Sequence, residues 1–169
     1  MAALSRLLRA AEQTCTLVAP ESAVGTAQGL RSHLADGRVV CWSASVPRGL
    51  RLAVDAEISD QPVPPALAYR FDLVDPHRFW AAWTAVEVSC KLRDVPILTW
   101  LKRRGLTPDP AIRTRTLRIA DITVTCGAAD LGHAVVNDRM QDRVQGAWQT
   151  PEGPYDRERR RSMTFARRV

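Results

Sequence analysis

The chain has 169 residues, 46% of them hydrophobic, which is enough for one domain with a hydrophobic core. Its charged fraction of 25% is that of an ordinary globular protein and argues against intrinsic disorder. No apolar run reaches the length of about 18 residues that a membrane-spanning helix needs, so the sequence predicts none.

The four cysteines, Cys15, Cys41, Cys90 and Cys126, occur singly and without the C-x-x-C spacing of zinc or redox motifs. The first 18 residues carry arginines and a glutamate among their apolar positions, which argues against a secretory signal. We therefore expect reduced thiols and a cytoplasmic location.

Apolar periodicity in the first 58 residues predicts a helix, a strand, a short helix and two further strands. They are expected at Ala2–Glu12, Thr14–Ala19, Glu21–Leu34, Val39–Ser45 and Leu50–Ile58. The turn signal at residues 46–49, which contains Pro47 and Gly49, separates the last two strands. Because this turn is short, we expect those two strands to pair as an antiparallel hairpin.

Strict alternation marks the strand over residues 50–58. Its apolar positions are the even-numbered ones: Leu50, Leu52, Val54, Ala56 and Ile58. Asp55 and Glu57 lie two residues apart and share the opposite face, because side chains alternate along a strand. Two adjacent carboxylates repel each other unless water screens them or a cation lies between them. The strand therefore predicts either an ordinary solvated face or oxygen ligands for a hard divalent ion such as Mg²⁺.

The rest of the chain reads as a helical turn, a long helix, a shorter helix and a β-hairpin. The helical turn is expected at Ala66–Phe71, the long helix at Pro76–Leu92 with Asp75 as cap, and the shorter helix at 94–105 with Asp94 as cap. The hairpin is expected to pair Thr116–Cys126 with Leu131–Asn137 across a turn at Gly127–Asp130. The order of elements is typical of an α+β protein in which an antiparallel sheet packs on one long helix.

Two stripes run along the long helix at a spacing of three and four residues. The apolar stripe contains Phe79, Trp83, Val86 and Cys90, and the adjoining stripe contains Trp80, Thr84, Glu87 and Lys91. Glu87 and Lys91 are neighbours one turn apart, so they form either an ordinary surface ion pair or a carboxylate and an ammonium that hold a metal and a phosphate side by side. Lys91 is one of only two lysines among 24 basic residues, and a compact ammonium suits a crowded phosphate site.

In these stretches the chain resembles the 4′-phosphopantetheinyl transferases. That family has a strand motif apolar-Gly-apolar-Asp-x-Glu and a helix motif Trp-(Ser/Thr)-x-Lys-Glu-Ala-x-x-Lys. The strand motif is matched by residues 52–57, with Ala53 in place of glycine. The helix motif is matched by residues 83–91, with Val86 in place of the first lysine and Val88 in place of alanine. Ser32-His33 is similar to a Ser-His pair that precedes the strand motif in the family.

The resemblance covers roughly Gly29 to Asn137 and is to the surfactin-type branch, whose members consist of two similar halves. Only 54 residues precede Asp55, which is too few for a full first half. We expect either a reduced first half or a second copy or partner subunit that completes the site. The implied fold is the α+β fold of the 4′-phosphopantetheinyl transferases.

The resemblance implies a Mg²⁺-dependent transfer of 4′-phosphopantetheine from coenzyme A to a serine of an acyl or peptidyl carrier protein, as in fatty acid or polyketide biosynthesis. It implies Asp55, Glu57 and Glu87 as metal ligands. Glu87 and Lys91 are the implied catalytic residues. Either Glu87 or a metal-held water would accept the serine proton, and Lys91 would pair with a pyrophosphate oxygen. His33, Arg31 and Lys91 are the implied coenzyme A-binding residues.

Residues 1–150 are expected to form a single domain, and 151–169 a basic, flexible tail. The last 14 residues hold six arginines against Asp156 and Glu158, which suits an acidic carrier protein as partner better than nucleic acid. Two rival interpretations remain: a non-catalytic scaffold of the same fold in a biosynthetic complex, favoured by Val86, and a nucleic-acid-binding module that uses the tail.

Overall fold

The computed structural model describes residues 2–19 and 29–130. All of them lie in the first of two compact units of the chain, Met1–Val135. The expected strand Leu131–Asn137, the expected domain boundary at residue 150 and the basic tail fall outside the described residues.

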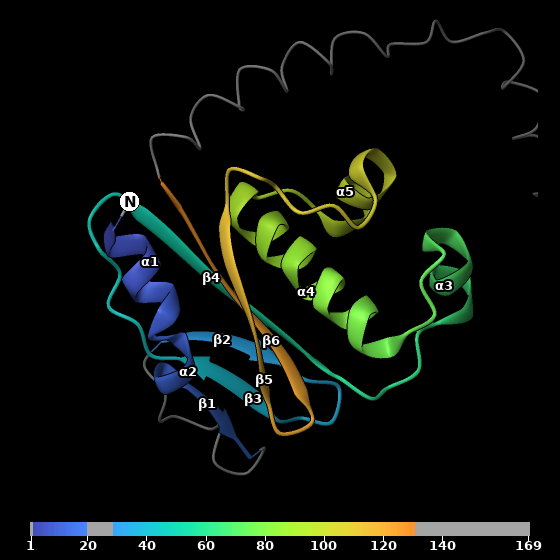
Figure 1. Ribbon diagram of the computed structural model, residues 1–169, viewed down its shortest axis with the longest axis horizontal. Helices are drawn as coiled ribbons and strands as arrows, with labels where there is room; N and C mark the ends of the chain where they lie inside the picture. Colours follow the sequence, from blue (N-terminus) through green and yellow to red (C-terminus); the bar gives the residue numbers. More distant parts are fainter. Residues whose placement is uncertain (1, 20–28, 131–169) are drawn as a thin grey trace, which may run out of the picture. The chain divides into compact units, whose positions relative to one another are not determined.

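The described residues form short helices, one long helix and two antiparallel sheets (Figure 1). The helices are α1 (Ala2–Arg9), α2 (Ala11–Thr14), α3 (Pro65–Phe71), α4 (Pro76–Arg93) and α5 (Ile97–Arg104). The strands are β1 (Cys15–Val18), β2 (Leu30–His33), β3 (Val39–Trp42), β4 (Leu50–Ile58), β5 (Arg113–Ile119) and β6 (Ile122–Asp130). The strand orders are β1-β3-β2 and β4-β6-β5, with every pairing antiparallel, which confirms the α+β class.

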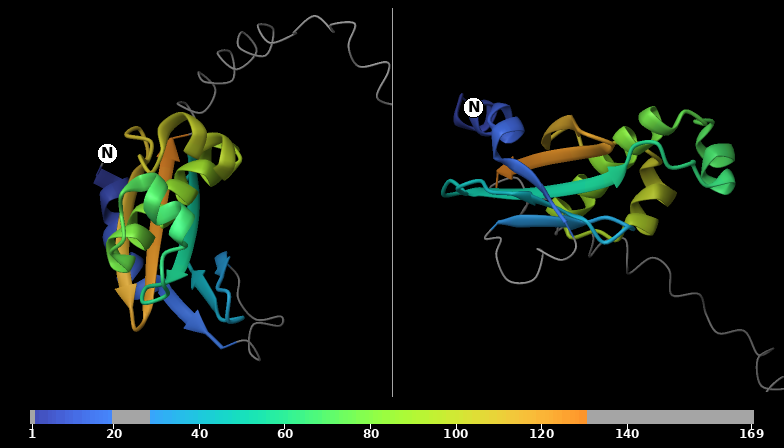
Figure 2. Two further views of the ribbon diagram at one scale, coloured as in Figure 1. Left: turned by 90° about the vertical axis from the view of Figure 1, so that its right-hand side faces the viewer. Right: turned by 90° about the horizontal axis from the view of Figure 1, so that it is seen from below.

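The β4-β6-β5 sheet is covered on both faces (Figure 2). On one face Val54 and Ala56 pack in a core with Leu8 of α1 and Trp42 of the other sheet. On the opposite face Ala53 packs with residues of α4. The apolar alternation predicted for β4 is confirmed, but its polar row points at a helix and not at water.

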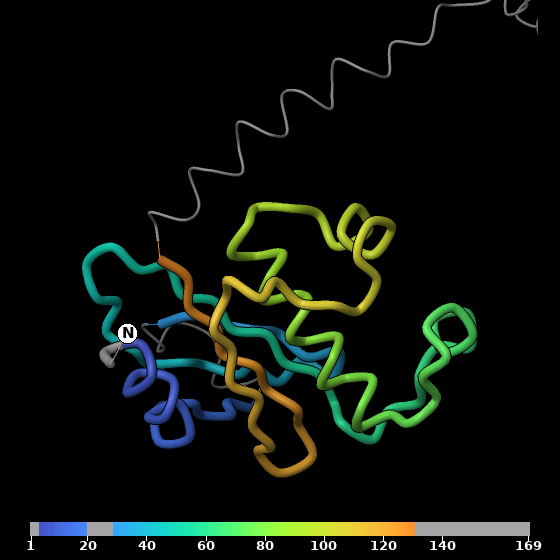
Figure 3. Tube along the Cα trace, turned by 45° about the horizontal axis from the view of Figure 1, so that its top comes forward, coloured from blue at the N-terminus to red at the C-terminus, as the bar shows by residue number. Residues whose placement is uncertain are grey.

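The long helix begins and ends where the sequence predicts. The Asp75 side chain accepts a hydrogen bond from the Arg78 N–H at 2.7 Å, and Pro76 occupies the first turn. The two elements of the predicted site, β4 and α4, follow each other in the sequence with only α3 between them (Figure 3). In the middle of the helix the Thr84 hydroxyl bonds the Thr125 hydroxyl of β6 at 2.8 Å.

Gly127 allows α4 to lie close to β6. A Cβ atom at this position would clash with Cγ1 of Val88, although the backbone of Gly127 has no unusual dihedral angle. The glycine is therefore needed for close packing of the helix and not for a turn.

The expected pairing of the strands over residues 39–45 and 50–58 is wrong. Residues 39–45 and 50–58 do not form a hairpin, because β3 pairs with β1 and β2 while β4 pairs with β6. All four side chains of β3 are buried, which is characteristic of a central strand. The segment Glu21–Leu34, expected to hold a short helix, contains a strand at its end, Leu30–His33, and residues 20–28 lie outside the described part.

The second expected hairpin is wrong in its described part. β6 runs straight through the proposed turn at 127–130, and the real turn lies at Ala120 and Asp121, between β5 and β6. Ala120 has a φ of 51°, a left-handed conformation that the sequence does not announce with glycine. Asp94 is likewise not the cap of the next helix: it ends α4 at a φ of 52°, and Pro96 precedes α5.

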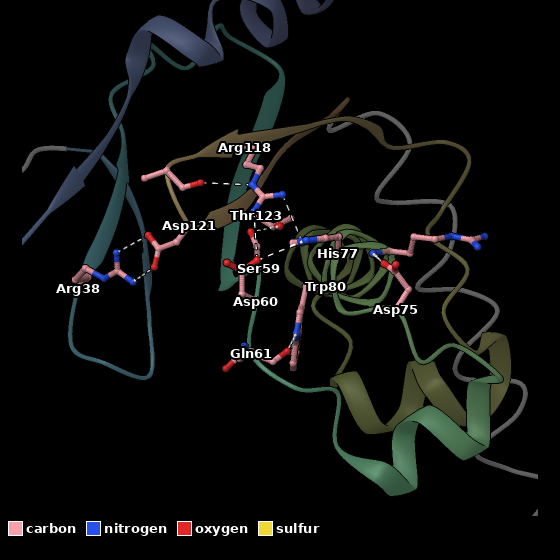
Figure 4. A network of polar contacts seen from close by, with 12 residues as sticks. Arg38, Ser59, Asp60, Gln61, Asp75, His77, Trp80, Arg118, Asp121 and Thr123 are labelled. Atoms are coloured by element: carbon pink, nitrogen blue, oxygen red, sulfur yellow. Dashed lines mark hydrogen bonds and ion pairs between the residues drawn. The ribbon is translucent and has the colours of Figure 1, made fainter.

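Polar contacts join the segment after β4 to α4, and the segment between β2 and β3 to the β5–β6 turn (Figure 4). The Trp80 indole N–H donates to the Gln61 carbonyl oxygen at 2.9 Å. Arg38 donates to both carboxylate oxygens of Asp121, at 2.8 and 2.7 Å. The bond from Trp80 holds the backbone of Gln61 in place, and the Gln61 side chain in turn bonds Glu57 of the predicted site.

In the described part of the chain, no helix combines the length and the apolar character needed to cross a bilayer.

Candidate functional site

Asp55 is the buried centre of the site. It lies in the middle of β4 with only 3% of its surface exposed, on the strand face that α4 covers. An isolated carboxylate at such a position costs several kcal/mol of desolvation unless it is paired or hydrogen-bonded. Its partners therefore determine whether the fold tolerates it.

The first partner is Lys91 of α4. Its Nζ donates to Asp55 Oδ1 at 2.7 Å and to the Val54 carbonyl oxygen at 2.9 Å. β4 is the edge strand of its sheet, so the backbone groups of alternate residues point away from β6 and need other partners. The lysine stem reaches along the helix to this edge, while 42% of its side chain remains exposed.

The second partner is Ser32 of β2, which is buried. Its hydroxyl donates to Asp55 Oδ1 at 3.2 Å and accepts a hydrogen bond from the Ala56 N–H at 3.1 Å. Ala56, like Val54, presents its backbone to the free edge of β4. Ser32 thus joins the two sheets at the carboxylate and satisfies a buried backbone donor.

Glu57 shares the strand face of Asp55 and is half-buried. Gln61 Nε2 donates to Glu57 Oε2 at 3.0 Å. The pKa of Glu57 is raised, first by burial and then by the nearby Asp55 carboxylate, against the opposing effects of Gln61 and Lys91.

Glu87 of α4 completes the group. Burial and the charge of Asp55 raise its pKa to about 7, with a further contribution from Glu57, while Lys91 opposes the rise. A proton on Glu87 would be shared with the Asp55 carboxylate, which also favours the protonated form. Carboxylates from a strand and a helix that are far apart in sequence thus meet within electrostatic reach, as expected for Asp55, Glu57 and Glu87.

The donor chemistry of this cluster fits a hard cation. Asp55 Oδ2 is a buried oxygen with no hydrogen-bond partner, while Oδ1 carries both Ser32 and Lys91. The neighbouring carboxylates of Glu57 and Glu87 supply further oxygen atoms of the kind Mg²⁺ prefers. Among residues 2–19 and 29–130, no group of three or more His, Cys, Asp or Glu side chains is already arranged around a common metal position. The cluster offers the ligand types and one unsatisfied oxygen, and Lys91 neutralises part of its charge.

The other two expected site residues lie elsewhere. Arg31 and His33 flank Ser32 on β2, are exposed, and occupy the strand face opposite to that of Ser32. The structure does not bring them into the carboxylate cluster, and their expected contact with coenzyme A stays a prediction. From the sequence, Ser32 is recognised only as part of a motif, and its contact with Asp55 is not predicted. The alternation of side chains along β2 could have suggested that the Ser32 hydroxyl faces inward.

Val86, the position at which the resembled helix motif has lysine, is fully buried. It packs with Cys90, Trp100 and Leu101, on the side of α4 that meets α5. A lysine here would have to bury its ammonium in an apolar cluster. The departure from the motif is therefore a packing feature of this chain.

Removing the Ser32 hydroxyl should weaken the fold as well as the site. We expect Ser32→Ala to lower the free energy of unfolding by about 1–3 kcal/mol, because it leaves the Ala56 N–H and a charged oxygen without their shared partner. Urea unfolding measures this effect. Ser45→Ala, at an exposed position, is the matched control, and an equal response of the two variants would contradict the role of Ser32.

The raised pKa of Glu87 predicts a pH-dependent stability in the absence of metal. Below its ordinary pKa Glu87 is protonated in both folded and unfolded chains, but around neutral pH the folded chain holds the proton more tightly. The free energy of unfolding should therefore fall as pH rises from about 5 to about 8, by about 1 kcal/mol for this half-exposed carboxyl. Glu57 contributes in the same direction.

Glu87→Gln isolates this contribution, because it removes the titration and keeps the size of the side chain. Thermal unfolding of the variant should be less sensitive to pH over that range, and Mg²⁺ should stabilise the wild type more than the variant at the alkaline end. Identical pH profiles for the two proteins would show that Glu87 does not titrate in the predicted range.

Comparison of the chain with models of known protein families, with curated proteins and with solved structures gives no match.

Proposed function

We propose that this protein transfers 4′-phosphopantetheine from coenzyme A to a serine of an acyl or peptidyl carrier protein in a Mg²⁺-dependent reaction. The observation that supports this best is the meeting of Asp55, Glu57 and Glu87 beside Lys91, with one buried carboxylate oxygen left unsatisfied. These four residues lie in the strand and helix motifs by which the chain resembles the 4′-phosphopantetheinyl transferases. We also propose that this α+β domain has the fold of that family.

The proposed chemistry is a phosphoryl-type transfer, in which catalysis consists mainly of positioning and charge neutralisation. Asp55, Glu57 and Glu87 would hold Mg²⁺. When bound, the ion supplies Lewis acidity that neutralises charge on the departing 3′,5′-bisphosphate nucleoside. Lys91 is tethered to Asp55 and to the Val54 carbonyl yet partly exposed, so its third N–H can pair with a pyrophosphate oxygen.

Glu87 is suited to accept the proton of the attacking serine hydroxyl. In the metal-free protein the pKa of Glu87 is raised to about 7. With Mg²⁺ bound this pKa would be lower, so the carboxylate form that accepts a proton would be present at neutral pH. Asp55 helps to set the metal-free value by its charge, while Ser32 and Lys91 hold the Asp55 carboxylate in place.

The proposal also assigns partners and a location. Arg31 and His33 would contact phosphates of coenzyme A from the exposed face of β2, and an acidic carrier protein would match the net charge of +6. A second copy or another subunit would complete the site. We place the reaction in the cytoplasm, in fatty acid or polyketide biosynthesis, and the four free cysteines agree with a reducing compartment.

The test is a mass measurement. The full chain is incubated with coenzyme A, Mg²⁺ and apo forms of several acyl and peptidyl carrier proteins, and each carrier is weighed. We expect one carrier to gain the mass of a phosphopantetheine group, and its serine-to-alanine variant to gain none. No gain on any carrier, with a transferase of known activity as positive control, would contradict the proposal.

A non-catalytic scaffold of the same fold is the second candidate. It is favoured by the buried Val86, which removes one positive charge of the resembled motif, and by Lys91, which already neutralises Asp55. A scaffold would bind a carrier or partner enzyme without modifying it. Retention of an apo carrier on the immobilised protein, without any gain in mass, is the result that would select this candidate.

A further inference from the structure

Two cysteines from different sheets lie in contact in the core. Cys15 Sγ, at the start of β1, and Cys126 Sγ, in β6, are 3.4 Å apart, although 111 positions separate the residues in the sequence. Both thiols are free and buried, and both belong to the core between the two sheets. They lie outside the carboxylate cluster and have no part in the proposed transfer.

The other two cysteines lie in different surroundings. Cys41 is the residue before Trp42 on β3, so it points away from the core that Trp42 enters. Cys90 lies on α4 and packs with Val86 and Trp100 in a separate cluster. The described part of the chain therefore contains one closely paired set of thiols and two single thiols that serve as internal references.

We propose that Cys15 and Cys126 are a redox modification site, which a hydroperoxide converts into a reversible disulfide between the two sheets. The Cys15 thiolate attacks one peroxide oxygen, the O–O bond breaks, and the leaving oxygen takes up a proton. The sulfur of Cys126 then attacks the resulting sulfenic acid of Cys15, and its proton leaves with the hydroxyl group as water. The two thiols are oxidised by two electrons and the peroxide is reduced by two.

The local environment assigns the two sulfur atoms their roles. Hydrogen bonding between the two thiols lowers the pKa of Cys15, whereas the same contact and burial raise the pKa of Cys126. Cys15 is also the more accessible residue, at 7% exposed against 0% for Cys126. On both grounds Cys15 is the attacking thiol and Cys126 the resolving one.

Bond formation requires only a small movement. The sulfur atoms must approach from 3.4 Å to about 2.05 Å, within the reach of side-chain rotation and a slight shift of β1. The bond would close a loop that spans most of the described chain, and cross-links across long loops restrict the unfolded state most. It would also fasten β6 at Cys126, directly opposite Val54, whose carbonyl holds Lys91.

The experiment treats the full chain with hydrogen peroxide, unfolds it, blocks the remaining thiols and identifies cross-linked peptides by mass spectrometry. We expect two of the four thiols to be lost, a single cross-link between Cys15 and Cys126, and a rise in the thermal midpoint of about 5–15 °C that dithiothreitol reverses. Cys41→Ser and Cys90→Ser should leave the cross-link intact, and Cys126→Ala should abolish it.

Three outcomes overturn the inference: all four thiols remain free at a peroxide dose that fully oxidises glutathione, the cross-link involves Cys41 or Cys90, or Cys15 is oxidised to sulfinic acid without a cross-link. Because the cross-link is read on the wild type, the result stands even if the Cys126→Ala variant is unstable. None of these readouts depends on carrier modification, so failure here and failure of the proposed transfer are separate results.

Discussion

Asp55→Asn and Glu87→Gln should each lower the rate of phosphopantetheine transfer by about 10²–10³-fold. Each change replaces a charged oxygen ligand by a neutral amide of the same size, at a point where the proposed reaction needs negative charge to hold Mg²⁺. Glu87→Gln also removes the proposed base. Initial rates of carrier modification at saturating coenzyme A measure the loss.

Asp94→Asn is the matched control. Asp94 forms an exposed ion pair with Arg51 and has a left-handed backbone, which asparagine adopts readily, so transfer should remain close to that of the wild type. Circular dichroism must show that the variants are folded, because Asp55→Asn also breaks the contact with Lys91. If both site variants are folded and fully active, the carboxylate cluster is not the catalytic centre.

Gly127→Val should destabilise the fold by about 3 kcal/mol, at the upper end of the usual cost of overpacking. Any side chain at this position meets Val88, so α4 must move away from β6. The same movement would separate Glu87 and Lys91 from Asp55, and we expect transfer to fall along with stability. Chemical unfolding gives the first quantity and the carrier assay gives the second.

A double-mutant cycle with Val88→Ala tests the packing argument. Val88→Ala alone leaves a cavity and destabilises, but combined with Gly127→Val it makes room for the new side chain. The pair should therefore be more stable than the sum of the single effects predicts. Thr16→Val, at an exposed strand position, should have little effect. Strict additivity at positions 88 and 127 would mean that the two residues do not share this contact.

The central parts of the fold and of the candidate site could be predicted from the sequence. Leu50–Ile58 forms a strand with the expected faces, and the expected long helix extends to Arg93. Both have strong local signals: strict alternation in the strand, and a cap followed by helical periodicity in the helix. Side-chain direction within each element then follows from its geometry. That is why Asp55 can be paired with Glu57, and Glu87 with Lys91, from residue spacing, whereas joining the two pairs in one site follows only from the family resemblance.

The pairing of strands could not be predicted, because it depends on contacts between distant segments. A short turn favours a hairpin between the segments at 39–45 and 50–58, yet burial of both faces makes β3 a central strand of another sheet. Gly127 looks like a turn residue in the sequence, although its role is to let a helix approach. The Ser32–Asp55 bond escapes prediction for the same reason, since it joins the edges of two sheets.

The contact between Val88 and Gly127 has a consequence for the history of this protein. Valine at position 88 packs against a strand position that carries no side chain, because a Cβ atom at Gly127 would clash with it. Substitutions at the two positions should be correlated during evolution: lineages that have alanine on the helix are free to carry a larger residue on the strand, and those with valine are not. An alignment of homologous chains in which bulky residues occur at both positions together would contradict this constraint.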